Sequence, residues 1–273
     1  MSRRAGLCHS RLVSLPYFQV DAFTSRVFGG NPAGVCPLAS WLPDETLQSI
    51  AGENNRSETA FVVREGSDFA LRWFTPTTEV DLCGHATLAA SFVIFTELGF
   101  AGETIRFQTK SGLLSAARDA DLITLDFPAW PSEPCAAPAA LVDGLGWMPR
   151  EVRRGMSDYL AVLASEADVL ALQPDMVQLA ALDCRGLIVT APGSDADFVS
   201  RFFAPRVGIP EDPVTGSAHS TLIPYWSARL GKPRLVARQL SRRGGELFCE
   251  DRGARVGIGG RAVLYSRAQL EIS

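Results

Sequence analysis

One pattern occurs twice in this chain and restricts its fold more than any other feature. FALRWFTP at residues 69–76 recurs as FVSRFFAP at residues 198–205. Before each copy lies an apolar run that leads into Gly-Ser-Asp, in FVVREGSD (61–68) and IVTAPGSD (188–195). After each copy comes a helix-like segment, CGHATLAASFVIFTELG (83–99) and TGSAHSTLIPYWSARLG (215–231). Three matching blocks in the same order predict two similar halves related by a pseudo-two-fold axis.

Each copy predicts the same elements: a strand, a Gly-Ser-Asp turn, a strand ending in Phe-x-Pro, an acidic loop and a helix. Gly99 and Gly231 are expected to end the two helices as C-terminal caps. The first helix, at about 84–98, is apolar on nearly all sides, so a sheet is expected to wrap around it. Pro224 is expected to kink the second. We therefore predict an α+β protein of two pseudo-symmetric domains, each a curved, mostly antiparallel sheet or barrel around a central helix.

The domain boundaries follow from the proline-rich segment DFPAWPSEPCAAPAA (126–140), which is expected to join the halves. We predict an N-terminal domain at 15–125 and a C-terminal domain at 126–261, with a last strand at about 262–273 that can return to the first domain. Residues 1–14 contain arginines and no apolar core long enough for a secretory signal, so we expect a disordered extension.

Composition argues against several classes of protein. Lys and Arg number 26 against 30 Asp and Glu, a net charge of −4 that suits neither nucleic acid nor an anionic membrane. No apolar run reaches the roughly 20 residues of a membrane span. The six cysteines are widely spaced and histidines number three, which argues against disulfides and structural zinc and fits a cytoplasmic location. Without a phosphate loop or dinucleotide fingerprint, we expect no metal and no organic cofactor.

The two predicted helix starts combine small residues with many polar groups. If both starts point into the cleft between the halves, their unpaired N–H groups and partial positive charge can bind an anion such as a carboxylate. Gly84 and Gly216 leave the backbone there approachable. The nearby polar residues are Glu79, Asp81, Cys83 and His85 in the first half, and Glu211, Asp212, Thr215, Ser217 and His219 in the second.

Several of these polar residues also have a purely structural interpretation. Asp81 and Asp212 suit a helix cap or first turn, as do Thr215 and Ser217. His85 alone would more often be a structural histidine with satisfied hydrogen bonds. Because the groups occur together at two related helix starts, a functional site is favoured.

Glu58 precedes an apolar run in the stretch NNRSETAFVV (54–63). A carboxylate at the mouth of a half-buried strand risks a desolvation penalty. Glu58 is therefore either a solvated strand-end residue or a group placed there for its chemistry. The stretch itself leaves both interpretations open.

Several motifs together resemble the phenazine biosynthesis (PhzF-like) family, within the diaminopimelate epimerase-like fold. They are YFQVDAFTSRVFGGNPAGV, NNRSETAFV, LRWFTPTTEVDLCGHATLA and FFAPRVGIPEDPVTGSAHSTLIPYW. The resemblance runs from about Pro16 to the C-terminus. It implies two similar domains, proton transfer at carbon without a cofactor in the inter-domain cleft, and a homodimer.

The resemblance also implies roles for individual residues. It makes Glu58, in the SET motif, the proton carrier, because a partly desolvated carboxylate can act as both acid and base. It places His85 and Asp212 beside the reacting centre, where they hold polar groups of the substrate or relay a proton. The groups that would hold the substrate carboxylate, through backbone N–H groups and a hydroxyl, are Gly84, Gly216 and Ser217.

Two further residues keep alternative interpretations. Asn31, in GGNPAG, resembles an asparagine that lines the same cleft and binds substrate, but a turn residue before Pro32 is an equally good interpretation. Cys83 is either an inherited catalytic thiol or a small buried side chain. A thiol at a helix start is expected to have a lowered pKa.

The predicted function is that of an isomerase that moves a proton and a double bond in a small carboxylate-bearing substrate, like the dihydro-hydroxyanthranilate isomerase of phenazine biosynthesis. One alternative is an amino-acid racemase or epimerase with two thiols, but DPVTG supplies no second cysteine as a partner for Cys83. Another alternative is a non-catalytic binding protein on the same scaffold.

Overall fold

A computed structural model describes residues 13–272 of the chain. The first half contains β1 (Val13–Ala22), β2 (Asn31–Leu38), α1 (Asp44–Asn54), β3 (Thr59–Glu65), β4 (Asp68–Phe74), β5 (Glu79–Val80), α2 (Gly84–Thr96), β6 (Thr104–Thr109), β7 (Gly112–Asp119) and β8 (Leu122–Pro128). The predicted extension, residues 1–14, lies outside the described residues except for Val13 and Ser14, which begin β1.

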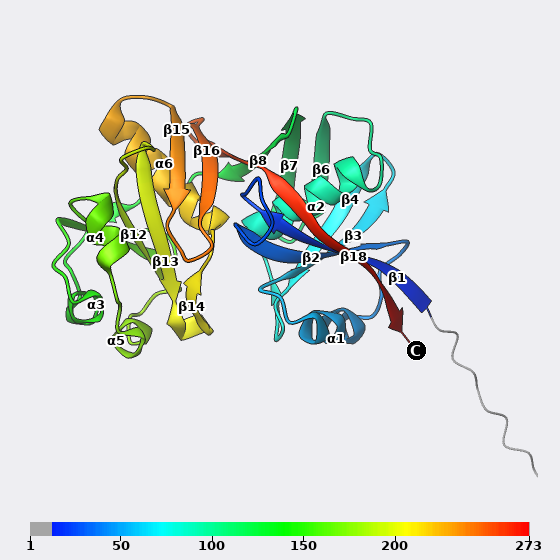
Figure 1. Cartoon of the computed structure of the whole chain (residues 1–273), viewed down its shortest axis with the longest axis horizontal. Helices are drawn as coiled ribbons and strands as arrows, with labels where there is room; N and C mark the ends of the chain where they lie inside the picture. Colours follow the sequence, from blue (N-terminus) through cyan, green and yellow to red (C-terminus); the bar gives the residue numbers. More distant parts are fainter. Residues whose placement is uncertain (1–12, 273) are drawn as a thin grey trace, which may run out of the picture.

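The second half follows without a long linker. Its elements are β9 (Glu133–Pro134), α3 (Ala139–Leu145), β10 (Glu151–Arg154), β11 (Asp158–Val162), α4 (Glu166–Ala171), α5 (Met176–Ala180), β12 (Gly186–Pro192), β13 (Phe198–Ala204), the 3-10 turn η1 (Pro205–Val207), β14 (Ile209–Asp212), α6 (Gly216–Leu230), β15 (Arg234–Gln239), β16 (Gly245–Asp251), β17 (Arg255–Gly260) and β18 (Ala262–Ile272). Figure 1 shows the halves side by side, with α2 among the strands of one and α6 among those of the other.

The repeat predicted from sequence appears as the same strand pairing in both halves. β3 pairs antiparallel with β4, and β4 pairs parallel with β6 beyond the helix. In the second half β12 pairs antiparallel with β13, and β13 pairs parallel with β15. The predicted α+β fold, with a curved, mostly antiparallel sheet around each central helix, is confirmed. α1, α3, α4 and α5 are additional helices that the sequence pattern did not indicate.

A charged pair is repeated with the fold. Arg72 on β4 donates two hydrogen bonds to Glu79, at 2.8 and 2.9 Å, and its guanidinium lies over the ring of Phe74. In the second half Arg201 on β13 donates to Glu211 at 2.7 and 3.0 Å. Each pair joins the central strand to the short strand before the helix. The arginine and the glutamate of each copy are therefore partners that brace the scaffold.

The Gly-Ser-Asp blocks occupy different positions in the two turns. In the first half Gly66 and Ser67 form a two-residue turn, and Gly66 has a φ of +64° that favours glycine. In the second half residues 193–197 separate the strands, so the matching Asp195 lies in the loop rather than at the strand start. The length of this turn therefore changed while the strands around it were retained.

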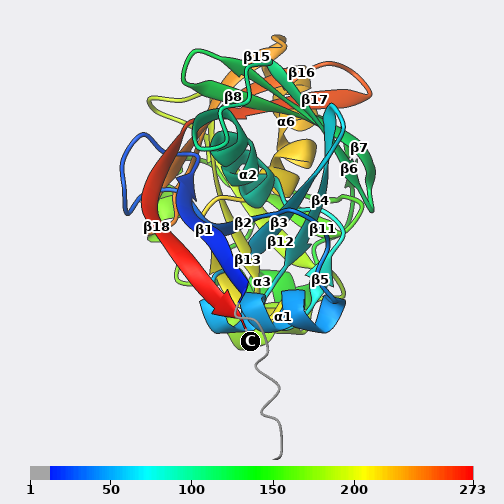
Figure 2. The ribbon, with the colours of Figure 1, turned by 90° about the vertical axis from the view of Figure 1, so that its right-hand side faces the viewer.

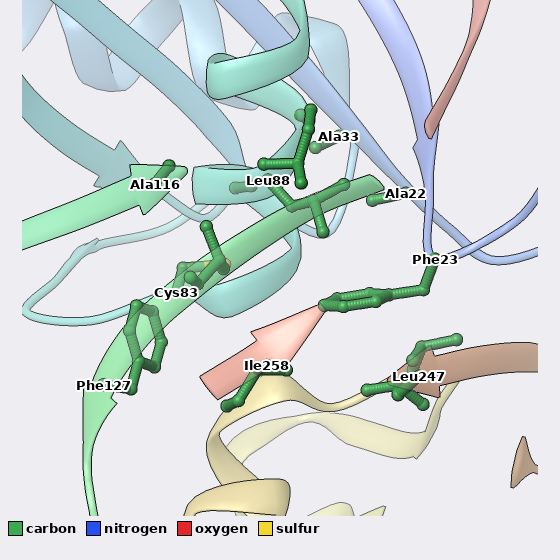
Figure 3. Packing of buried hydrophobic residues seen from close by; sticks show 14 of the residues in the cluster. Ala22, Phe23, Ala33, Cys83, Leu88, Ala116, Phe127, Leu247 and Ile258 are labelled. Atoms are coloured by element: carbon green, nitrogen blue, oxygen red, sulfur yellow. The ribbon is translucent and has the colours of Figure 1, made fainter. Parts of the chain in front are cut away.

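The helix α2 is enclosed by sheet, as its apolar sequence predicts. Eleven of its residues are buried, including His85 and Thr87. Figure 2 views the molecule with the first half toward the reader, and shows α2 within a ring of strands, with α6 behind it. The core continues between the halves: Leu88 of α2 belongs to the same buried cluster as Phe23, Leu247 and Ile258, which Figure 3 shows close together.

Strand pairing ties the two halves to each other. β8 pairs antiparallel with β17 over six residue pairs, from Ile123 opposite Gly260 to Pro128 opposite Arg255. β18 leaves the second half and pairs antiparallel with β1, from Ala262 opposite Ala22 to Ile272 opposite Val13. The domain boundaries remain a prediction. Within residues 13–272, no helix has the length and apolar character that crossing a membrane requires.

Candidate active site

The starts of α2 and α6 meet between the halves. Gly84 and Gly216 are the first residues of the two helices, and a Cβ added to Gly84 would lie 2.9 Å from the Cα of Gly216. Neither Cys83 nor Thr215, the residues before the helices, caps its helix with a side-chain hydrogen bond. Two helix N-termini therefore face one another with approachable N–H groups and partial positive charge.

A small cavity of about 80 Å³ opens at this meeting point. Its lining combines acid–base groups with apolar side chains: Glu58, Leu82, Cys83, Gly84, His85, Arg185, Phe202, Ala204, Val207, Ile209, Asp212, Thr215, Gly216 and Ser217. Larger hollows, of about 360 and 400 Å³, lie elsewhere on the molecule. The cavity at the helix starts is the more convincing site, because it brings Glu58, His85 and Asp212 together.

Glu58 and His85 form a pair at the edge of this cavity. Glu58 directly precedes β3 and His85 is the second residue of α2, so each sits at the end of a buried element. Glu58 Oε2 lies 3.0 Å from His85 Nε2, and the side chains are 12% and 5% exposed. Among the described residues, Glu58 Oε2 has no hydrogen bond of regular geometry. The carboxylate is thus held beside His85, and its Oε2 is a buried oxygen.

The surroundings of His85 favour its charged form. Burial opposes a positive charge on the ring, but Cys83 and the Glu58 carboxylate outweigh burial, so the pKa of His85 is raised well above its ordinary value. Cys83 Sγ lies 3.6 Å from His85 Nδ1.

For Cys83 the prediction of a lowered pKa is wrong: burial, and then the nearby Glu58, raise the pKa of the thiol. The helix start is present, but it does not outweigh desolvation.

Asp212 ends β14 and faces His85 from the second half. Its Oδ2 accepts a hydrogen bond from Thr215 Oγ1 at 2.5 Å, and its Oδ1 accepts one from Asn31 Nδ2 at 2.8 Å. Burial, and then the nearby Glu58, raise the pKa of Asp212, although His85 and both hydrogen bonds act in the opposite direction. Asp212 is therefore a carboxyl group held in a fixed position beside the cavity.

Asn31 is not part of the cavity lining but lies behind it. It is fully buried at the start of β2, and its Nδ2 donates to Asp212 and, at 2.9 Å, to the carbonyl oxygen of Val214. The same nitrogen lies 3.1 Å from His85 Nδ1. Asn31 thus connects the first half to the helix start of the second and positions Asp212, while it packs against His85.

The sequence interpretation missed Arg185, which lines the cavity directly before β12. Arg185 Nε donates to Asp158 Oδ1 at 2.9 Å, its Nη2 pairs with Asp158 Oδ2, and its Nη1 donates to Ser217 Oγ at 3.0 Å. In the sequence, DCRGL resembles an exposed turn. The available signal was that a charged residue precedes the first repeated strand of both halves.

Gln239, at the end of β15, was also missed. Its Oε1 accepts a hydrogen bond from the backbone N–H of Thr215 at 2.8 Å, and its Nε2 donates to the backbone carbonyl of Asp212 at 2.8 Å. Gln239 is 1% exposed. It fixes the loop between Asp212 and the start of α6 from behind.

Other polar residues near the helix starts do not join the site. Glu79 and Glu211 pair with arginines, and Asp81 is exposed. His219 is fully buried one turn into α6, where its Nδ1 donates to the carbonyl oxygen of Thr215 at 2.8 Å. Burial lowers the pKa of His219 to about 4, so the ring is neutral near pH 7.

A metal-ligand set is also present in this cavity. Glu58, Cys83 and His85 carry ligand atoms within 4.8 Å of one another, and thiolate, imidazole and carboxylate are zinc ligands. The raised pKa of Cys83 opposes this use, because the metal-binding form is the thiolate. The expectation of a metal-free site remains a prediction.

Comparison with known proteins agrees with the motifs. The family model of phenazine biosynthesis-like (PhzC-PhzF) proteins matches residues 20–268. An uncharacterized isomerase of Pseudomonas aeruginosa is 54% identical over 260 residues, which cover 95% of this chain and all of that protein. The crystal structure of a PhzF family phenazine biosynthesis protein from Enterococcus faecalis has a TM-score of 0.93 at 48% identity, covering 95% of this chain and all of the other.

A more distant comparison concerns the fold alone. A hydroxyproline epimerase from Agrobacterium vitis has a TM-score of 0.63 at 12% identity, covering 96% of this chain and 92% of the other. The epimerase-like arrangement of the two halves is therefore shared beyond the family. Because the family model covers most of the chain and the P. aeruginosa relative is more than half identical, the chain belongs to the phenazine biosynthesis-like (PhzC-PhzF) family.

Proposed function

We propose that the protein is a cofactor-independent isomerase that moves a proton, and with it a double bond, in a small carboxylate-bearing substrate. The observation that carries this proposal is the Glu58–His85 pair, at 3.0 Å, beside two helix N-termini that meet at one cavity. The pair supplies an acid–base group, and the helix starts supply a place for an anion.

In the proposed reaction, Glu58 takes a proton from a substrate carbon. The C–H bond breaks, an O–H bond forms on the carboxylate, and the electron pair of the C–H bond enters the conjugated system as the double bond moves. Glu58 then returns the proton to another carbon of the same molecule. No oxidant or second substrate is needed, because the proton and the electron pair both remain with the product and the enzyme.

The other groups hold the substrate and the charge that develops. The substrate carboxylate lies at the N–H groups of Gly84 and Gly216 and the hydroxyl of Ser217, where helix starts favour negative charge. His85 lies 3.0 Å from Glu58, beside the carbon that loses the proton, and its raised pKa favours a positive charge there. Asp212 holds a polar group of the substrate or relays a proton.

The substrate class is limited by the cavity. A volume of about 80 Å³ accommodates a small acid, whereas pockets for drug-sized ligands usually span about 300–1,000 Å³. The resemblance to phenazine biosynthesis proteins suggests a dihydro-hydroxyanthranilate-type acid. It also suggests a cytoplasmic homodimer. The substrate type, the location and the dimer are all part of this proposal.

An amino-acid racemase or epimerase is a weaker candidate. Cys83 lines the cavity, but Thr215 occupies the corresponding place before α6 and donates its hydroxyl hydrogen to Asp212. A racemase that uses Cys83 would lose its exchange activity in Cys83→Ser. The proposed Glu58 mechanism predicts instead that Cys83→Ser retains exchange, which also separates it from a non-catalytic protein that exchanges nothing.

The direct test is deuterium exchange. The wild-type chain is incubated in D₂O with small unsaturated carboxylic acids and amino acids, and incorporation is followed by mass spectrometry and NMR. We expect Glu58→Gln to lower the rate at least about 100-fold, the usual contribution of a positioned acid–base group. Glu53→Gln, an exposed glutamate of α1, is the matched control. Exchange at the wild-type rate in Glu58→Gln would refute the assignment of the base.

A further inference from the structure

Arg185 presents a positive group to the cavity from a rigid setting. It directly precedes β12, and β12 pairs in parallel with β11 so that Gly186 lies opposite Asp158. This pairing puts the Asp158 carboxylate, which is 4% exposed, beside the guanidinium. The guanidinium also lies 5.3 Å from the ring centroid of Phe202. Asp158 and Phe202 together hold the Arg185 side chain in one orientation.

Two N–H groups of Arg185 remain available after these contacts. A guanidinium has five N–H donors. Asp158 accepts from Nε and Nη2, and Ser217 Oγ accepts from Nη1. The remaining N–H groups, one on each terminal nitrogen, belong to a side chain that lines the cavity and is 35% exposed. A purely structural ion pair with Asp158 would not require a guanidinium whose remaining N–H groups face the cavity.

The contact with Ser217 also fixes how that hydroxyl can act. Because Ser217 Oγ accepts a hydrogen bond from Arg185 Nη1, the hydroxyl hydrogen of Ser217 points elsewhere. Ser217 is the second residue of α6 and lines the cavity. Its hydrogen can therefore be donated into the cavity, next to the remaining N–H groups of Arg185.

We propose that Arg185 is the specificity-determining residue of this site: it joins Ser217 and the N–H groups at the two helix starts in binding the substrate carboxylate, and so directs the reacting carbon toward Glu58. The inference rests on the proposed function and adds the direction of binding. The substrate class is an acid whose carboxylate and reacting carbon lie at opposite ends of the cavity. An amide or ester of the same acid lacks the charge that Arg185 recognises.

The test compares acids with their amides, which differ in charge and little in shape. Dissociation constants are measured by calorimetry for 2-aminobenzoate against 2-aminobenzamide and for crotonate against crotonamide. For the wild-type chain we expect a preference for the acid of about 10- to 100-fold in at least one pair, the range of a charge-assisted hydrogen bond. We expect Arg185→Met to reduce this preference below about 3-fold and Arg185→Lys to restore part of it.

Control variants separate specificity from folding. Arg185→Met leaves Asp158 as an unpaired buried charge, which destabilises the fold. The double variant Arg185→Met/Asp158→Asn also lacks the guanidinium but leaves no unpaired carboxylate. Arg238→Met, an arginine of the same half outside the cavity, is expected to keep the wild-type preference. If the wild-type chain prefers no acid, or the double variant retains the full preference, the inference is wrong.

Failure of this inference is distinguishable from failure of the proposed function. Glu58→Gln is expected to lose deuterium exchange and keep the preference for acids. If Glu58→Gln continues to exchange while Arg185→Met loses the preference, the assignment of the base is wrong and that of the carboxylate site stands. If Glu58→Gln loses exchange while Arg185→Met keeps the preference for acids, the role of Arg185 is wrong and the assignment of Glu58 as the base stands.

Discussion

The two halves repeat one scaffold and place opposite charges at the same point of it. Glu58 directly precedes β3 in the first half, and Arg185 directly precedes β12 in the second. Both line the cavity at the meeting helix starts. The strands, the helix with its first glycine and the Arg–Glu pair outside the cavity are retained, whereas most polar residues that line the cavity differ. Repetition therefore supplies the geometry, and the difference at this position places a carboxylate on one side of the cavity and a guanidinium on the other.

The same contrast holds along the two helices. The fourth residue is Thr87 in α2 and His219 in α6, and each side chain donates a hydrogen bond to the carbonyl oxygen just before its helix. The second residue is His85 in α2 and Ser217 in α6. A histidine therefore has a structural role in one half, whereas in the other it stands beside Glu58. His219 and His85 differ in this way because one is the fourth residue of its helix and the other is the second.

The largest effect is expected where the halves touch. In Gly84→Ala, the new Cβ would lie 2.9 Å from the Cα of Gly216, a backbone atom that cannot move alone. We expect a loss of about 3 kcal/mol or more in the free energy of unfolding, together with loss of acid binding. Urea denaturation measures the first and calorimetry the second. Gly52→Ala in α1, where the Cβ would lie 3.4 Å from a carbonyl oxygen, is the control. A fully stable Gly84→Ala chain would contradict close contact of the helix starts.

A slightly smaller effect is expected from acid titration of His219. Its folded pKa is about 4, below the ordinary 6.5, so the unfolded chain binds more protons between these values. Stability from this group is present above pH 6.5 and is lost as the pH falls toward 4, by up to roughly 3 kcal/mol. His219→Thr, which copies Thr87, is expected to lack this pH dependence in urea unfolding.

His85 is expected to show the opposite sign. Its pKa is raised in the folded chain, so its contribution to stability is complete below pH 6.5 and is lost as the pH rises through the folded pKa. Subtracting the pH profile of His85→Gln from that of the wild-type chain isolates this contribution. If the free energy of unfolding changes with pH in the same way for His219→Thr and His85→Gln, the two histidines do not differ in the sign of their contribution.

The smallest difference is expected between the two Arg–Glu pairs. Arg201 donates not only to Glu211 but also to the backbone carbonyl oxygens of Val169 and Leu172, at 3.2 and 2.9 Å. Arg72 instead has a second partner in the exposed Asp44. We expect Arg201→Met to cost about 1 to 2 kcal/mol more than Arg72→Met in urea denaturation, because buried carbonyl groups lose their donors. Equal costs would indicate that the repeated pairs are energetically equivalent.

Sequence patterns were sufficient for the features that repeat. The two helices and the strands around them follow from local motifs and their duplication, whereas the gathering of Glu58, His85 and Asp212 was implied by the resemblance to a known family. Arg185 was missed because its partners, Asp158 and Ser217, are brought to it by parallel strand pairing and by packing of α6, which no local pattern reveals. The pKa direction of Cys83 was wrong for a related reason: the helix start is visible in the sequence, but the depth of its burial is not.

The return of β18 to β1 affects how the chain folds during synthesis. β18, which completes the edge of the first half, is synthesised more than two hundred residues after β1, the strand that it pairs with. Until β18 leaves the ribosome, the edge of β1 lacks the partner that it has in the native fold. The two halves therefore reach their final form together, and a chain truncated before β18 leaves the first half incomplete although its own residues are all present.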